Sequence, residues 1–208
     1  MRAIEEAEIA SGRATWRDLM ERACAAVAQA LTTGMPTPGR AVVLCGPGNN
    51  GGDGYGTAVR LREAGWTVEV FALGDPARQS GAAADMVARW GAPVRPLEDA
   101  GDGPFADLLV DAVFGIGLSR PVPQTVIDAH RAARRRQGGV AGRVTRVVAI
   151  DCPSGLDADT GALRVPEGVR VAGPRPPMAA DVTVTFHAPK PGHYLDRGPE
   201  VCGALEVV

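Results

Sequence analysis

The feature that most constrains this chain is a short apolar run that leads directly into a glycine-rich segment. Residues 41–45 read Ala-Val-Val-Leu-Cys, and residues 46–54 hold five glycines in nine positions. Glycine lets a backbone turn sharply and lets another group approach it closely. A buried strand that feeds such a segment, with a helical pattern after it, is typical of anion-binding sites in α/β proteins. The sequence therefore predicts a ligand site where this strand ends.

The glycine-rich segment also carries side-chain oxygens that a plain phosphate loop does not need, on Asn49, Asn50 and Asp53. Its glycines satisfy the GxGxxG spacing of dinucleotide folds, but no acidic residue ends the next predicted strand, as that fold requires. A Walker phosphate loop is excluded because Gly52 stands where its lysine belongs. The segment thus predicts ligand contact without the fingerprint of an ordinary nicotinamide dehydrogenase.

Strand and helix patterns alternate along the rest of the chain. The predicted strands cover residues 41–45, 67–73, 93–96, 107–111, 145–150, 181–186 and 203–208. The predicted helices cover residues 54–64, 78–90 and 123–136, after two N-terminal helices broken near Gly12. This order predicts an α/β fold, a Rossmann-like three-layer αβα sandwich with a mostly parallel central sheet. We assign residues 1–208 to a single domain, with N-terminal helices in 1–33 and an α/β core in 40–208.

Composition and charge argue against several classes of partner. The chain has 208 residues and a net charge of −2, so neither nucleic acid nor an anionic membrane is an expected partner. The basic run at residues 134–136 is expected to be a solvated helix end. No apolar run approaches the roughly 20 residues that cross a bilayer, and the N-terminus lacks a signal-peptide pattern. Four scattered cysteines without CxxC spacing indicate reduced thiols in a cytoplasmic protein.

Polar residues gather where predicted strands end. Asp111 and Asp151 each close a strand, and Ser154 follows the second of them by three residues. Ligands of a doubly wound sheet lie beyond the carboxyl ends of its strands, so we expect these residues to share a crevice with Asn50. Taken singly, each acid also has a plainer interpretation as a helix or turn cap.

The side chains of Asn50, Asp111 and Ser154 are all hard oxygen donors. Oxygen donors suit hard cations rather than zinc or copper. One carboxylate among neutral oxygens favours a loosely held monovalent cation.

A further strand end carries Lys190, within the sequence Pro-Lys-Pro-Gly. It is the only lysine among 22 basic residues. Lysine is a compact point charge that arginine does not always replace. Lys190 is therefore a candidate to bind a phosphate or a carboxylate, and the alternative is an ordinary surface lysine.

Taken together, these motifs resemble the NAD(P)H-hydrate epimerases, the YjeF N-terminal domain family, over the whole chain. The motifs that carry the resemblance are residues 46–54, 111–121, 151–155 and 189–192. Residues 20–23, Met-Glu-Arg-Ala, also resemble the family's helix motif, with Cys24 where glycine is usual. We expect that departure to affect helix packing and not chemistry.

The resemblance implies an isomerase that repairs damaged nicotinamide nucleotides. Its substrate would be NADH or NADPH hydrated at C6 of the nicotinamide ring, and it would interconvert the R and S epimers. An ADP- or ATP-dependent dehydratase that accepts only one epimer would be its functional partner, in some relatives fused to the same chain. A homodimer is also implied. The alternative is a non-catalytic nucleotide-binding or scaffold module on the same fold, but the retained Asp53, Asp111 and Asp151 favour an enzyme.

Site residues carry over onto matching positions of this chain. Those implied or proposed to contact substrate are Asn49, Asn50, Gly51, Gly52, Asp53, Gly115, Ile116, Gly117, Leu118, Ser119, Arg120, Pro121, Asp151 and Lys190. The resemblance further implies one potassium ion per subunit, held by Asn50, Asp111 and Ser154. Asp151 is our candidate catalytic acid/base, because inverting a carbon needs a proton-transfer group beside it. Arg120 and the glycine-rich backbone would grip the pyrophosphate.

Overall fold

The computed structural model describes residues 2–136, 142–169 and 176–208, so Met1 and residues 137–141 and 170–175 of the predicted domain lie outside it. Its strands form a seven-stranded sheet in the order β3-β2-β1-β4-β5-β6-β7. The strands are β1 (Arg40–Cys45), β2 (Thr67–Ala72), β3 (Val94–Pro96), β4 (Leu108–Ala112), β5 (Arg146–Ile150), β6 (Val182–Thr185) and β7 (Ala204–Val207). The helices are α1 (Arg2–Ala10), α2 (Trp16–Gly34), α3 (Asn49–Glu63), α4 (Gly81–Trp90), α5 (Gln124–Arg134) and α6 (Gly198–Val201).

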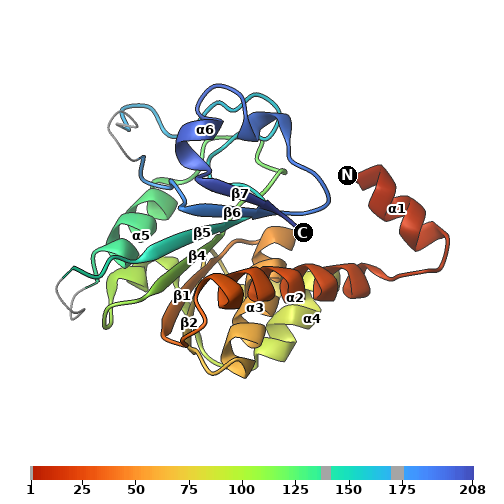
Figure 1. Cartoon of the computed structure of the whole chain (residues 1–208), viewed down its shortest axis with the longest axis horizontal. Coiled ribbons are helices and arrows are strands. Elements are labelled where there is room, and N and C mark those ends of the chain that lie inside the picture. Colours follow the sequence, from red (N-terminus) through yellow and green to blue (C-terminus); the bar gives the residue numbers. More distant parts are fainter. Residues whose placement is uncertain (1, 137–141, 170–175) are drawn as a thin grey trace.

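Helices cover both faces of this sheet (Figure 1). Side chains alternate between the two faces along a strand. In β1, Val43 therefore packs in the core under α2, α3 and α4, whereas Val42 and Leu44 pack in the core under α5. The predicted αβα sandwich is confirmed, and the sheet, expected to be mostly parallel, is parallel at every described pairing.

The N-terminal region forms two helices, as predicted, with a break at Gly12, whose φ is +71°. The second helix, α2, begins with a capping box. The Thr15 side chain accepts a hydrogen bond from the Asp18 backbone, and the Asp18 carboxylate accepts one from the Thr15 backbone at 2.8 Å. Helix α2 packs on the sheet, while α1 projects away from the body of the domain (Figure 1).

The segment from Asn49 to Asp53 is helical, and here the sequence-based boundary was wrong. Helix α3 begins at Asn49, not at residue 54, with Gly48 as its extended N-cap residue. Glycine costs about 1 kcal/mol relative to alanine inside a helix. Packing explains why glycine is used: a Cβ atom on Gly51 would overlap the carbonyl oxygen of Gly46, and one on Gly56 would overlap the sulfur of Cys24. The glycines let α3 approach its neighbours closely, and only residues 46–48 form a loop.

Arg136 departs from the expected solvated helix end. It is 5% exposed, and its guanidinium donates hydrogen bonds to the carbonyl oxygen of Ala100 and the carboxylate of Glu69, each at 2.8 Å. The same guanidinium lies 5.1 Å from the centre of the Phe71 ring. Arg136 therefore ties α5 to the sheet.

Candidate active site

The strand order brings the predicted motifs to one edge of the sheet. β1, β4, β5 and β6 are consecutive neighbours, and all run in the same direction. The loops that follow their carboxyl ends therefore meet at a single edge. From β1 the chain first adds β2 and β3 on one side of the sheet and then adds β4 to β7 on the other side. Open α/β sheets bind ligands at such a switch point, which here lies between β1 and β4.

Asp151 is the first residue after β5, and it forms an ion pair with Lys190. One oxygen of its carboxylate, Oδ1, lies 2.7 Å from Lys190 Nζ and accepts a hydrogen bond from the Thr185 hydroxyl at 3.1 Å. The other, Oδ2, accepts from the backbone amide of Ile116 at 3.4 Å. The side chains of Asp151 and Lys190 are only 6% and 11% exposed. The structure thus joins two candidates that the sequence places 39 positions apart.

Lys190 makes two further hydrogen bonds through the same ammonium group. Nζ donates to the Thr185 hydroxyl at 2.7 Å and to the carbonyl oxygen of Phe186 at 3.1 Å. The carboxylate that this lysine binds is therefore that of Asp151, and the alternative of an ordinary surface lysine was wrong.

Asp111 and Ser154 form a second, fully buried cluster. The Ser154 hydroxyl donates to Asp111 Oδ1 at 2.5 Å, and the Ser154 amide donates to Asp111 Oδ2 at 2.8 Å. His130 on α5 places Nε2 3.3 Å from Oδ2. Burial by itself raises the pKa of Asp111, but His130 and the hydrogen bonds from Ser154 outweigh it and hold that pKa below its ordinary value.

The side chain of Asn50 lies close to the segment that follows β4. A Cβ atom on Gly115 would sit 3.1 Å from both Asn50 Oδ1 and Asp151 Oδ2. The adjacent Phe114 amide donates to the Ser154 hydroxyl at 2.9 Å. Asn50, Asp151 and Ser154 therefore all reach the segment that follows β4, as expected from the convergence of strand ends.

Asn50, Asp111 and Ser154 carry the oxygen donors of the predicted cation site, and the ion itself stays a prediction. The side-chain nitrogen of Asn50 is buried and has no hydrogen-bond partner. Because the nitrogen and oxygen of an amide are assigned from their surroundings, an amide oxygen at that position would suit a cation. Among the described residues, no group of three or more His, Cys, Asp or Glu side chains is placed to hold a metal. Neutral oxygens with a single carboxylate are what a singly charged ion needs.

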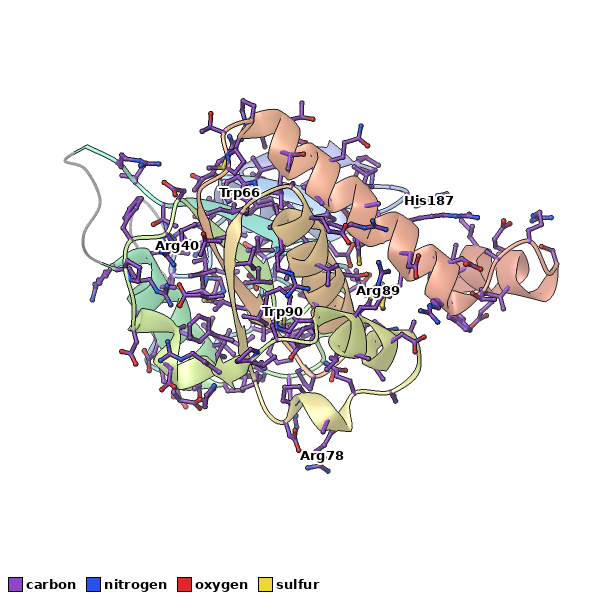
Figure 2. The ribbon with its side chains drawn as sticks, turned by 90° about the horizontal axis from the view of Figure 1, so that it is seen from below. Arg40, Trp66, Arg78, Arg89, Trp90 and His187 are labelled. Carbon is purple, nitrogen blue, oxygen red and sulfur yellow. The ribbon has the colours of Figure 1, made fainter. Side chains whose placement is uncertain are left out.

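A cavity of about 460 Å³ opens beside the start of α3, between that helix and helices α1 and α2. Figure 2 shows His187 beside α2, and this residue forms part of the cavity wall. Other residues that line it include Trp16, Met20, Asn49, Asp53 and Phe186. Its size and its mixture of apolar and polar walls are those of a small-molecule site.

Asp53 lines this cavity, and its carboxyl group has no hydrogen-bond donor among the described residues. Within the described part of the chain no hydrogen bond or ion pair reaches its carboxyl group, which is 9% exposed. Burial raises the pKa of Asp53 well above its ordinary value, and the negative charges of Asp151 and Glu5 raise it further. Asp53 is therefore suited to hold a proton, whereas Asp151 is a carboxylate that is paired with Lys190.

Only the start of the loop at residues 115–121, which was predicted to wrap phosphates, lies at the Asp151 carboxylate. Gly115 and Ile116 contact the Asp151 carboxylate, as described above. Residues 117–121 make no hydrogen bond or ion pair with Asp53, Asp111 or Asp151, and Arg120 is exposed. Their proposed contact with substrate stays a prediction.

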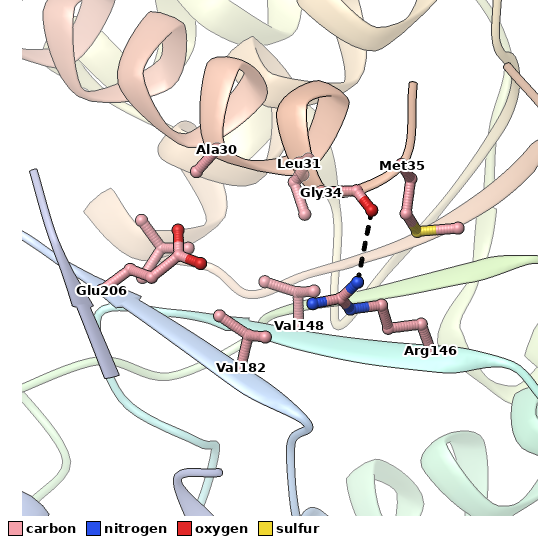
Figure 3. Close-up of a pocket in the computed structure, with 9 residues that line it drawn as sticks. Ala30, Leu31, Gly34, Met35, Arg146, Val148, Val182 and Glu206 are labelled. Carbon is pink, nitrogen blue, oxygen red and sulfur yellow. Dashed lines mark hydrogen bonds between the residues drawn. The ribbon is translucent and has the colours of Figure 1, made fainter. Parts of the chain in front are cut away.

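A smaller cavity lies at the opposite end of the sheet (Figure 3). It is formed between the last turn of α2 and the first residues of β5 and β6, where Arg146 donates to the carbonyl oxygen of Gly34 at 3.4 Å. Its volume is about 10 Å³, the space of about one water molecule. It is too small for a metabolite.

Comparison with known proteins agrees with this geometry. A family profile described as "YjeF-related protein N-terminus" matches residues 17–192. The chain belongs to this family. The matched range includes every predicted site residue of this YjeF-related chain, from Asn49 to Lys190.

Curated relatives of this YjeF-related chain carry a consistent name. It is 42% identical to a protein named NAD(P)H-hydrate epimerase from Cereibacter sphaeroides, over 99% of this chain and 97% of that protein. A protein of the same name from Rhodobacter capsulatus is 43% identical, over 93% and 88%. A Coxiella burnetii protein named bifunctional NAD(P)H-hydrate repair enzyme Nnr is 35% identical over all of this chain but over only 39% of its own length.

A solved structure of the yeast protein YNL200c has the same fold. It superposes with a TM-score of 0.66 and 24% identity, over 88% of this YjeF-related chain and 76% of the yeast chain. At this identity the likeness supports the fold alone.

Sequence reasoning missed three residues that shape the site of this YjeF-related chain. Thr185 binds both members of the ion pair, His130 touches Asp111, and His193 contacts the backbone of Asp151. One signal was available for Thr185: it is a polar residue in a strand that is buried along its length. His130 gave none, because a lone histidine on a helix is usually an ordinary packed residue.

Proposed function

We propose that this chain is an NAD(P)H-hydrate epimerase, an isomerase that interconverts the R and S epimers of hydrated NADH and NADPH. Its curated relatives carry that name over nearly their full length. The observation that carries the proposal is the Asp151–Lys190 ion pair, which follows the carboxyl ends of β5 and β6 and has Asn50 and Gly115 close to the Asp151 carboxylate. A buried carboxylate at a ligand crevice is what a proton-transfer step at carbon requires.

Asp151 and Asp53 have different roles in this proposal because their surroundings differ. Lys190 and Thr185 hold the Asp151 carboxylate, which takes a proton from the hydroxyl or the ring of the substrate. Asp53, whose raised pKa suits it to hold a proton, serves as the donor. Enzymes commonly give two carboxyl groups different roles by placing them in different surroundings.

The remaining residues bind and orient the nucleotide. Asn49 and Asp53 line the cavity at the start of α3, so this turn forms one wall of the substrate site together with Asn50, Gly51 and Gly52. The loop from Gly115 to Pro121 wraps the phosphates. The exposed guanidinium of Arg120 on that loop is free to meet a phosphate, and such pairs are among the stronger hydrogen bonds.

We assign one potassium ion per subunit to Asn50, Asp111 and Ser154. When bound, it supplies a fixed positive charge beside the substrate. Ser154 holds Asp111 through two hydrogen bonds, and Asn50 contributes the amide that otherwise has no partner.

The proposed setting is the cytoplasm, with a separate or fused dehydratase as functional partner. The chain matches about a third of the length of relatives named as bifunctional repair enzymes, which supports that pairing. The four described cysteines are free and buried, in keeping with a reducing compartment. No helix among the described residues is long and apolar enough to cross a membrane. We also propose a homodimer formed through the N-terminal helices.

A direct assay tests the function. A mixture of hydrated NADH epimers is given to an S-specific dehydratase in excess, with and without this protein. The R epimer should be consumed faster when the protein is present. Equal rates with and without it would refute the epimerase assignment.

A further inference from the structure

The side chain of His193 lies behind the Asp151–Lys190 pair and contacts the backbone of both residues. It is 2% exposed and ends the short 3-10 turn Pro191–His193. Nε2 lies 3.0 Å from the carbonyl oxygen of Asp151 and 3.2 Å from the sulfur of the buried Cys152. Nδ1 lies 3.2 Å from the backbone nitrogen of Lys190. One ring therefore bridges the two chain segments that carry the ion pair.

The two contacts define which ring nitrogen carries the proton. The Lys190 amide can only donate, so Nδ1 must be the unprotonated acceptor. Nε2 must then carry hydrogen, which it donates to the carbonyl oxygen of Asp151. Burial and the nearby charge of Lys190 lower the pKa of His193, which keeps the ring neutral as this arrangement needs.

The backbone of Asp151 needs such support. Its φ is +66°, in the left-handed region that residues other than glycine rarely adopt. Its amide donates to the carbonyl oxygen of Val184 at 2.7 Å, and its carbonyl oxygen accepts from His193. Both peptide groups around this strained residue are thus held, and the carboxylate is aimed at Lys190. Strained residues persist only where their surroundings determine them.

We propose that His193 is a positioning residue that holds the Asp151 carboxylate and the Lys190 ammonium in register by bridging their backbones. The catalytic consequence rests on the proposed function of Asp151. The bridge itself can be tested without any activity, so the two ideas can fail separately.

Three substitutions separate the two contacts. His193→Phe keeps the size of the ring but removes both hydrogen bonds. His193→Gln places an amide near the position of Nε2 and can keep the bond to Asp151, whereas His193→Asn places one near Nδ1 and can keep the bond to Lys190. We expect His193→Phe to lower kcat about 10- to 100-fold with KM changed less than about twofold, because small misplacements of catalytic groups cost rate and not binding. The Gln variant should retain more of kcat than the Asn variant.

The single lysine of the chain provides a readout that does not depend on activity. With lysine labelled by ¹³C and ¹⁵N at its terminal positions, only Lys190 contributes a side-chain signal. In the native protein this ammonium signal should show slow hydrogen exchange, since three oxygen atoms accept its bonds. In His193→Phe it should move towards the position of free lysine, as it should in Asp151→Asn.

Tyr194→Phe is the matched control, because this neighbour in the chain is 64% exposed. It should leave kcat and the lysine signal unchanged. The proposal is overturned if the His193 variants keep the native lysine signal, or if their loss of kcat merely follows their loss of thermal stability. If His193→Phe does not fold, the comparison of the Gln and Asn variants decides in the same way. An inactive native protein with a lysine signal that responds to His193 would refute the epimerase and keep the bridge.

Discussion

At the scale of single residues, the site depends on how two side chains and one backbone amide hold one carboxylate. Lys190, Thr185 and the Ile116 amide all reach Asp151, so its orientation is fixed before any substrate arrives. Preorganised groups of this kind need no rearrangement during the reaction.

Asp151→Asn should fold normally and lose activity. Asparagine tolerates a positive φ, so the backbone at this position has no reason to change. It cannot accept the proton, and we expect kcat to fall at least about 100-fold. Asp196→Asn is the control, since Asp196 also has a positive φ, of 44°, but is exposed outside the site. Coupled epimerase assays and thermal unfolding measure the two effects, and full activity in Asp151→Asn would remove this residue from the mechanism.

Asn50→Ala should weaken activity, with partial recovery at high potassium. Losing one of three ligands lowers the affinity for the ion, and mass action compensates for lower affinity. The assay titrates potassium chloride against choline chloride at constant ionic strength. Asn49→Ala, which alters the neighbouring amide outside the proposed ligand set, should not shift the potassium dependence. A native enzyme whose rate ignores potassium throughout the titration would contradict the cation assignment.

At the scale of elements, the close packing of α3 decides where its first turn lies. The helix starts at Asn49, and its first turn passes so near the preceding loop that there is no room for a side chain at Gly51. Its neighbours α2 and α4 make their contacts at glycine positions, including Gly52 against Met20 and Ala83. The glycines that set the position of α3 therefore also set the position of the proposed substrate wall.

Gly51→Ala should destabilise the protein by about 1–3 kcal/mol, the usual cost of overpacking a tight interior. The added methyl group would collide with the backbone carbonyl of Gly46, which has no side-chain freedom to move aside. Gly48→Ala is the control, because nothing lies within 4 Å of a Cβ atom there. Urea unfolding compares the two variants. Equal stability would mean that α3 can shift to accept the methyl group.

The same helix marks the limit of what the sequence predicts. The alternation of strands and helices, the break at Gly12 and the convergence of Asn50, Asp111 and Asp151 followed from periodicity and from the rule for parallel sheets. The start of α3 did not, because local propensity reads glycine as loop while tertiary packing here requires it inside a helix. The Asp151–Lys190 pair could not be predicted from the sequence either. Local sequence patterns do not show that the proline-rich loop around Lys190 folds back onto the end of β5.

At the scale of the whole molecule, helix α1 stands apart from the sandwich, whereas α2 packs on it (Figure 1). Helix α1 projects from the domain, and Ile4 and Trp16 are 53% and 46% exposed. Both also line the cavity beside α3. The N-terminal region thus links the substrate cavity to the surface that we propose joins two subunits.

The chain should sediment as a dimer, and Ile4→Glu should shift it towards monomer. A charge in an apolar contact between subunits must be desolvated without a partner, which is costly. Glu6→Gln on the same helix is the control, because it removes a charge from an exposed position. Analytical ultracentrifugation over a range of concentrations measures the equilibrium. A native monomer at high concentration would refute the dimer.

The early start of α3 has one more consequence. A helix carries about half a positive charge at its first turn, from backbone amides that have no partner within the helix. Here that turn stands only three residues after β1, at the ligand edge of the sheet. The favourable electrostatic potential for an anionic nucleotide is therefore built into the main chain. Mutating the side chains of this turn can reshape the pocket, but it leaves that potential in place.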